Sequence, residues 1–167
     1  MLASAIIKQM EKIIEVTSGK GEGLTELAAF DAALQDAGIS NYNLIYLSSI
    51  IPPGFEAKVE KPTPNDKEFG HRLYVVMAQE STEKKGSKAW AGLGWAMRES
   101  GGGGLFVEHH GGSEGEVVKL ITDSLNSMKS HRKEKYGEIK YEVVGIECKD
   151  KPVCALVCAV YKSEGWE

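Results

Sequence analysis

The segment from Val153 to Tyr161 constrains the fold most, because it is apolar at nearly every position. A strand with no polar face must be covered on both sides, as a central strand between layers is. The segment from Ile139 to Cys148 precedes it and is also predicted to be a strand. We therefore expect a layered structure with this final strand in its interior.

Two amphipathic helices are predicted to supply outer layers. From Leu24 to Ala37 apolar residues recur at helical spacing, and Gly38 supplies a stop. Ser113 and Glu116 form a capping box ahead of a second apolar stripe, which predicts a helix reaching to about residue 135.

The other regular segments are predicted to be strands. A first strand, Lys12 to Thr17, should end in a loop at Ser18 to Gly21. The later strands are expected at 42–50 and, joined as an antiparallel meander, at 71–80, 89–99 and 104–109. Residues 60–69 are predicted to be a loop, and residues 1–11 a short helical arm or a leader. Two helices and about seven strands in 167 residues predict one α/β domain spanning 1–167, built as a layered sandwich.

Composition narrows the class of protein. The 20 basic and 24 acidic residues give a formal net charge of -4 and no basic stripe, which argues against a nucleic-acid partner. No apolar run approaches the roughly 20 residues that cross a bilayer, and Met1 to Lys12 is too short for a signal peptide, so we expect a cytoplasmic protein without a membrane partner. Three cysteines, at positions 148, 154 and 158, are expected to be buried reduced thiols.

The pair Ser48-Ser49 is the main candidate for chemistry, although a serine pair alone is most often a turn or a strand end. It follows an apolar strand and precedes Pro52-Pro53-Gly54, whose rigidity would help to hold an unusual backbone conformation. The Oγ of Ser49 could then attack the Ser48 carbonyl and form an ester. β-Elimination would give dehydroalanine, and hydrolysis with loss of ammonia would leave a pyruvoyl group.

A pyruvoyl group would need no external cofactor, neither a metal nor pyridoxal phosphate. Its carbonyl can form a Schiff base with a substrate amine and accept electrons as carbon dioxide leaves, which is the role of pyridoxal phosphate in other enzymes. Amino-acid decarboxylation is the natural use of such a group.

Two acids are candidates to work beside the serine pair. Asp31 falls on the apolar stripe of the first helix, so we expect it to face inward and to need a partner. That partner is either an internal arginine or backbone amides, or the cationic end of a substrate. Glu108 ends a short strand after a glycine-rich loop, where partial burial would raise its pKa and favour proton donation; the alternative is a surface acid.

The adjacent histidines and the glycine-rich segments give weaker indications of function. Adjacent strand residues point to opposite faces, so His109 and His110 are not expected to share a metal ion. The glycine-containing segments 18–21 and 101–104 complete no phosphate-binding motif and are expected to be flexible loops.

Four segments together resemble a known family. They are Thr17-Ser18-Gly19; the Asp31 helix ending in Asp36-Ala37-Gly38-Ile39; Asn43-Leu44 through Ser48-Ser49-Ile50 to Pro52-Pro53-Gly54; and Gly104-Leu105 to Glu108 with His110-Gly111. From about Ile13 to Tyr161 the chain resembles the pyruvoyl-dependent arginine decarboxylases. The resemblance implies cleavage between Ser48 and Ser49 into a β chain, 1–48, and an α chain, 49–167, with Ser49 becoming the pyruvoyl group. It also implies a four-layer αββα sandwich with mainly antiparallel sheets, assembled as a homotrimer with active sites between subunits.

The same resemblance implies roles for five further residues. Glu108 would be the proton donor after decarboxylation, and Asp31 would hold the guanidinium of the substrate. Asn43 would assist cleavage and catalysis by hydrogen bonding. Leu34 and Ile50 would line the substrate pocket.

The function expected from the resemblance is decarboxylation of L-arginine to agmatine and carbon dioxide, in polyamine biosynthesis or acid resistance. Two alternatives stay open. The same chemistry could act on histidine, lysine or ornithine, or the chain could be an unprocessed, non-enzymatic binding protein.

Overall fold

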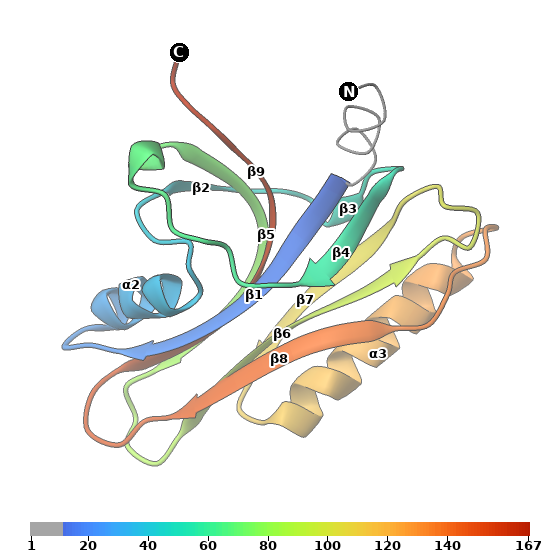
Figure 1. Ribbon diagram of the computed structural model, residues 1–167. Coiled ribbons are helices and arrows are strands. Elements are labelled where there is room, and N and C mark those ends of the chain that lie inside the picture. Colours follow the sequence, from blue (N-terminus) through green and yellow to red (C-terminus); the bar gives the residue numbers. More distant parts are fainter. Residues whose placement is uncertain (1–11) are drawn as a thin grey trace.

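The computed structural model describes residues 12–167, so the arm or leader predicted for residues 1–11 lies outside the described part. This part contains nine strands, two α-helices and one 3-10 turn (Figure 1). In chain order they are β1 (Lys12–Glu22), α2 (Glu26–Asp36), β2 (Asn43–Tyr46), β3 (Ile50–Ile51), β4 (Phe55–Val59), η1 (Asp66–Glu68), β5 (Arg72–Thr82), β6 (Lys88–Met97), β7 (Gly104–Gly111), α3 (Glu114–Ser130), β8 (Lys140–Glu147) and β9 (Val153–Glu164).

The strands form two sheets that pack face to face between two helices (Figure 1). One sheet has the order β2-β5-β9-β1-β4 and is covered by α2, whereas the other has the order β3-β7-β6-β8 and is covered by α3. Only β1–β4 and β2–β5 pair in parallel; the other strand pairs are antiparallel. The predicted four-layer αββα sandwich with mainly antiparallel sheets is confirmed.

Three apolar layers hold the sandwich together, one between the sheets and one under each helix. Residues 153–159 of β9 are all buried and alternate between two of these layers: Val157 packs between the sheets, and Leu156 packs under α2. The prediction that this segment is a central strand covered on both faces is therefore confirmed.

The loop predicted at Ser18–Gly21 is wrong, because β1 continues to Glu22. Its glycines are required by the close approach of α2. A Cβ on Gly19 would lie 2.1 Å from the carbonyl oxygen of Ala33, and one on Gly21 would lie 2.6 Å from Ala32 Cβ. Glycine at these positions lets the helix backbone rest directly on the strand, so here it indicates helix–sheet contact rather than a loop.

The predicted meander is only partly right. Strands β6 and β7 are antiparallel neighbours, but β5 lies in the other sheet, so the turn after Thr82 crosses between sheets. The turn between β8 and β9 crosses beside it, and the amide of Gly86 donates to the carbonyl of Cys148. Turn composition does not distinguish such a crossing from a hairpin within one sheet.

Other boundaries differ in smaller ways. Helix α3 is capped by Ser113 as predicted but ends at Ser130, where the apolar stripe gives way to polar residues. The single strand predicted at 42–50 is two, β2 and β3, in different sheets, and β4 was not predicted. The loop at 60–69 is confirmed and contains the 3-10 turn.

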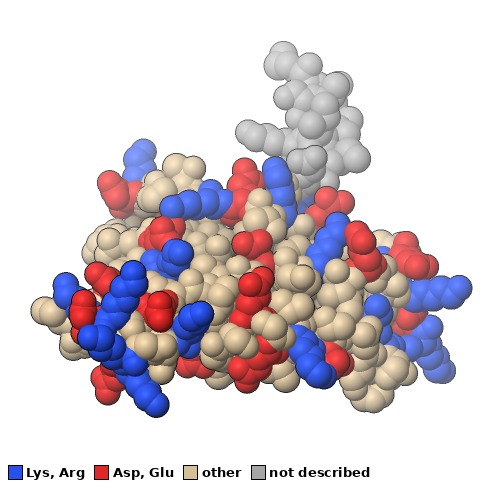
Figure 2. Space-filling model, turned by 90° about the horizontal axis from the view of Figure 1, so that it is seen from below, with Lys and Arg blue, Asp and Glu red and all other residues tan. Residues whose placement is uncertain are grey.

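The cysteines and the surface charges are arranged as the composition led us to expect. All three cysteines are buried and free, as predicted. Figure 2 shows acidic and basic side chains interspersed over the face seen from below, with no continuous area of one sign. Within residues 12–167, neither helix is long and apolar enough to span a bilayer.

Candidate active site

The serine pair lies where the chain crosses from one sheet to the other. Strand β2 ends at Tyr46 in the five-stranded sheet, and β3 begins at Ile50 in the four-stranded sheet. The amide of Leu47 donates to the carbonyl of Val75, which still belongs to the first sheet. The carbonyl of Ser49 accepts a hydrogen bond of 2.9 Å from the amide of Phe106 on β7, so the crossing is completed within two residues.

Ser49 has a left-handed backbone conformation, with φ of 68°. A residue other than glycine adopts the left-handed backbone region at a cost of about 1–2 kcal/mol, so surrounding contacts must hold Ser49 there. The strain falls on the residue after the peptide bond predicted to be cut. Sequence reasoning anticipated an unusual conformation from the proline pair, and the sheet crossing adds a second cause.

Glu108 holds the side chain of Ser49. The Ser49 hydroxyl lies 2.8 Å from both carboxylate oxygens of Glu108. Side chains on a strand alternate, so Phe106 and Glu108 of β7 share the face toward the other sheet: Phe106 is buried in the core, whereas Glu108 is exposed at its margin. The arrangement places a base that can accept the hydroxyl proton next to the predicted nucleophile.

Tyr161 of β9 completes this group and was not predicted from the sequence. Its hydroxyl donates a 2.8 Å hydrogen bond to the carbonyl of Ile50, and its ring packs edge-on against Phe106. Burial, together with the negative charge of Glu108, raises the pKa of Tyr161. The sequence feature that could have pointed to Tyr161 is a hydroxyl-bearing aromatic residue at the end of the otherwise apolar segment from Val153.

The two histidines next to Glu108 point to different neighbours, as predicted. A ring nitrogen of His109 lies 2.7 Å from the Ser124 hydroxyl of α3, and burial lowers the pKa of His109. His110 instead lies 2.7 Å from a carboxylate oxygen of Glu80 on β5. Residues 12–167 contain no cluster of three or more histidine, cysteine or acidic side chains placed to bind a metal.

Asp31 does not face inward, so that prediction is wrong for the single chain. Its carboxylate is exposed and accepts a hydrogen bond from the Gln35 side chain. The helix buries its small face on the glycines of β1, which turns Leu27, 76% exposed, and Asp31 outward. Asp31 was predicted to face inward from its helical spacing to neighbouring apolar residues, but Leu27, one of these neighbours, is itself exposed. Leu34 is buried under the helix instead of lining a surface pocket.

Asn43 and Ile50 are not brought into contact with the Ser49–Glu108 pair by their side chains. The side-chain amide of Asn43 donates a hydrogen bond to the carbonyl of Gly70. The Ile50 side chain is 54% exposed and lines a cavity of about 450 Å³ that includes neither Ser49 nor Glu108.

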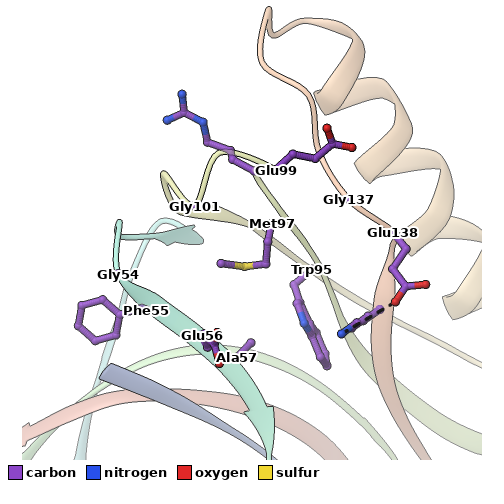
Figure 3. A pocket seen from close by; sticks show the side chains of 12 residues that line it. Gly54, Phe55, Glu56, Ala57, Trp95, Met97, Glu99, Gly101, Gly137 and Glu138 are labelled. Carbon is purple, nitrogen blue, oxygen red and sulfur yellow. Dashed lines mark ion pairs between the residues drawn. The ribbon is translucent and has the colours of Figure 1, made fainter. Parts of the chain in front are cut away.

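A cavity of about 500 Å³ lies apart from the serine pair (Figure 3). Phe55, Trp95 and Met97 form its apolar wall, and Glu99 and Glu138 lie at its rim. Neither Ser49 nor Glu108 lines this cavity. The candidate site is therefore the margin of the sandwich around Ser49, where the predicted nucleophile and Glu108 meet, and not the larger cavity.

The chain is similar to proteins of one known family. The sequence profile of the family "Pyruvoyl-dependent arginine decarboxylase" matches residues 13–164. A pyruvoyl-dependent arginine decarboxylase of Thermococcus sibiricus is 35% identical over 144 residues, which cover 86% of this chain and 90% of that protein. The enzyme of the same name from Pyrococcus abyssi is 36% identical over 140 residues, 83% of this chain and 87% of the relative. That of Halobacterium salinarum is 44% identical over 95 residues, 57% and 58% of the two chains.

The matched region begins one residue into β1 and ends at the last residue of β9, so it contains both sheets, both described helices and the serine pair. The chain belongs to the pyruvoyl-dependent arginine decarboxylase family.

Proposed function

We propose that this chain cuts itself between Ser48 and Ser49 and that the product decarboxylates L-arginine to agmatine and carbon dioxide. The observation that carries the proposal is the hydrogen bonding of the Ser49 hydroxyl to both oxygens of Glu108, on a backbone strained at Ser49. Membership of the family supports the pyruvoyl group and the class of substrate.

The geometry supplies a route for the first proton of self-cleavage. As the Ser49 oxygen attacks the Ser48 carbonyl carbon, its proton passes to the Glu108 carboxylate, 2.8 Å away. The Ser49 nitrogen takes up a proton as it leaves the Ser48 carbonyl, and an ester replaces the peptide bond. β-Elimination removes the α-proton of residue 49 and releases the Ser48 carboxylate, which turns residue 49 into dehydroalanine. This enamine tautomerises to an imine, and water hydrolyses the imine to the pyruvoyl ketone and ammonia.

The residues around position 49 fit the pyruvoyl group that would form there. The precursor side chain is a serine, half-buried, with an acid at hydrogen-bonding distance. When present, the group would supply an electron-accepting carbonyl for loss of carbon dioxide. Glu108 would then deliver a proton to the substrate α-carbon, because it is already fixed beside residue 49.

We further propose that substrate recognition needs a second subunit. Asp31 lies on the exposed face of α2 beside Leu27, and Leu24, two residues before the helix, is 83% exposed. Exposed leucines flanking an acid fit a surface that is covered in an assembly. In a homotrimer with active sites between subunits, this face of one subunit would meet the Ser49 margin of the next, and Asp31 would hold the guanidinium.

The remaining expectations rest on the sequence or on the resemblance and stay predictions. They are the assistance of Asn43, the lining of the pocket by Leu34 and Ile50, the organisation of 1–167 as one domain without a metal or pyridoxal phosphate, a cytoplasmic location, and a place in polyamine biosynthesis or acid resistance. Because Leu34 is buried in this chain, its predicted role requires a shift of α2 or an indirect effect on the pocket.

Turnover of the purified protein tests the substrate. Release of carbon dioxide is measured with arginine, histidine, lysine and ornithine at equal concentration. We expect arginine to give the highest kcat/KM, because a guanidinium binds a carboxylate through two parallel hydrogen bonds. A higher value with another amino acid would replace arginine as the substrate and leave the cleavage chemistry in place.

A further inference from the structure

The segment after the cleavage site has few attachments to the rest of the protein. Strand β3 contains only Ile50 and Ile51, and within residues 12–167 it pairs with β7 alone, at the edge of its sheet. On that side the Phe106 amide donates to the Ser49 carbonyl, and Ile50 lies opposite Leu105 in the register. Successive carbonyls of a strand point in opposite directions, so the carbonyl of Ile50 points away from β7.

Tyr161 provides the attachment on the free side. Its hydroxyl donates a 2.8 Å hydrogen bond to the Ile50 carbonyl from β9 of the opposite sheet. The tyrosine ring is fixed in turn, because it packs edge-on against the fully buried Phe106 with 6.3 Å between ring centroids. One rigid side chain therefore connects the edge of one sheet to the centre of the other.

The electrostatic setting keeps Tyr161 a donor. Burial, followed by the nearby charge of Glu108, raises its pKa above the ordinary value of a phenol. The hydroxyl therefore stays protonated at neutral pH, so the hydrogen bond to Ile50 does not depend on pH there.

Cleavage makes this attachment more important. In the uncut chain, Leu47 is bonded to Val75 just before the serine pair, so position 49 is held from both sides. After the cut, residue 49 becomes the first residue of a new chain, and chain ends fray unless they are tied down. The hydrogen bonds from Phe106 and Tyr161 to carbonyls 49 and 50 are then what holds the new terminus beside Glu108.

We propose that Tyr161 is a positioning residue that keeps residue 49 beside Glu108 once the chain has been cut. The role rests on the proposed self-cleavage. It acts through the backbone of Ile50, so it should affect how often the reactive carbonyl is in place and not how substrate binds.

Tyr161→Phe tests the proposal, because it removes the hydroxyl and keeps the ring against Phe106. We expect kcat to fall about three- to tenfold with KM unchanged, as for loss of one hydrogen bond that orients a reacting group. The fraction of chains carrying the ketone, measured by mass spectrometry, should match that of wild type. The matched control is Tyr74→Phe, which removes a hydroxyl bonded at 3.1 Å to Glu164 in the same sheet.

Hydrogen exchange gives a second readout that does not require turnover. In processed Tyr161→Phe, the amide of Phe106, which donates to the Ser49 carbonyl, should exchange faster than in wild type, whereas Tyr74→Phe should leave it unchanged. Unchanged kcat and exchange in Tyr161→Phe, or the same losses in Tyr74→Phe, would overturn the proposal. If wild type is never cut, the proposed function fails. The uncut variants Ser49→Ala and Ser49→Ala/Tyr161→Phe are then compared to decide whether Tyr161 holds this segment. Equal exchange rates in the two variants would reject the role of Tyr161.

Discussion

The hydroxyl oxygen of Ser49 lies 2.8 Å from each carboxylate oxygen of Glu108, although the two residues are 59 positions apart in the chain. The contact joins the sheet crossing after β2 to the exposed margin of β7. Under the proposed function, Glu108 would accept the proton of the strained serine during cleavage and would later serve as the acid beside the same position.

Replacement of Glu108 by glutamine should slow both cleavage and turnover. Glutamine keeps the size and a hydrogen-bond acceptor but cannot take or give the proton. We expect kcat to fall by at least about 100-fold with little change in KM, the usual cost of losing a general acid or base. Steady-state kinetics on fully processed protein measures this, and a loss confined to KM would contradict the role.

Replacement of Asp31 by asparagine should chiefly weaken substrate binding. Loss of one charge-assisted contact to a guanidinium predicts a rise in KM of about 10- to 100-fold. Asp36→Asn is the matched control on the same helix, since the Asp36 carboxylate accepts a hydrogen bond from the backbone amide of Lys20. Equal KM values for the two variants would remove Asp31 from the substrate site.

The stability of the fold should fall in mild acid, partly through His109. Burial lowers its pKa in the folded protein, although Glu108 opposes this effect, so the unfolded chain binds the proton more readily. The contribution of neutral His109 to the free energy of unfolding is fully present above the pKa of histidine in the unfolded chain, about 6.5. It is lost as pH falls below this value toward the pKa of His109 in the folded protein. Urea unfolding at about pH 7.5 and about pH 5 should show a smaller loss for His109→Gln than for wild type; an equal loss would contradict this.

Adding a methyl group at Gly19 should destabilise the protein. The new Cβ would lie 2.1 Å from the carbonyl oxygen of Ala33, so α2 would have to move off β1. We expect Gly19→Ala to reduce the free energy of unfolding by about 1–3 kcal/mol or more in urea titrations. Gly112→Ala is the control, because its Cβ meets nothing within 4 Å; similar losses in both variants would show that the contact does not matter.

The sequence predicted the layers of the fold better than its connections. The apolar run from Val153 and the N-cap at Ser113 depend on local patterns and were right. The glycines of β1 were misread, because their reason is a helix that passes over them. The turn after β5 was also misread, since nothing local distinguishes a hairpin from a crossing between sheets.

Some residues of the candidate site could likewise be predicted from the sequence, and others could not. Ser49 and Glu108 could be named from the sequence, and the structure places them together. The orientation of Asp31 could not be predicted, because it depends on which face of α2 packs on β1, the face of Ala29 and Ala33 or that of Leu27. Tyr161 was missed because its partner is a backbone carbonyl, which leaves no trace in the residue types.

Replacing Ser49 itself separates the chemistry from the fold. Ser49→Ala removes the attacking oxygen and should leave one uncut chain without decarboxylase activity, whereas Ser48→Ala keeps the nucleophile and should still be cut. Denaturing electrophoresis after prolonged incubation shows the difference. Cleavage of Ser49→Ala, or equal behaviour of both variants, would contradict the assignment of Ser49.

The mass of the intact purified protein tests the central claim most directly. Self-cleavage predicts two chains, 1–48 and 49–167, whose masses add up to that of the full chain plus one water minus one ammonia. Ordinary hydrolysis of the same bond would add one water and lose no ammonia. A ketone at the start of the 49–167 chain is the result we expect, and a single uncut chain after prolonged incubation would contradict the account.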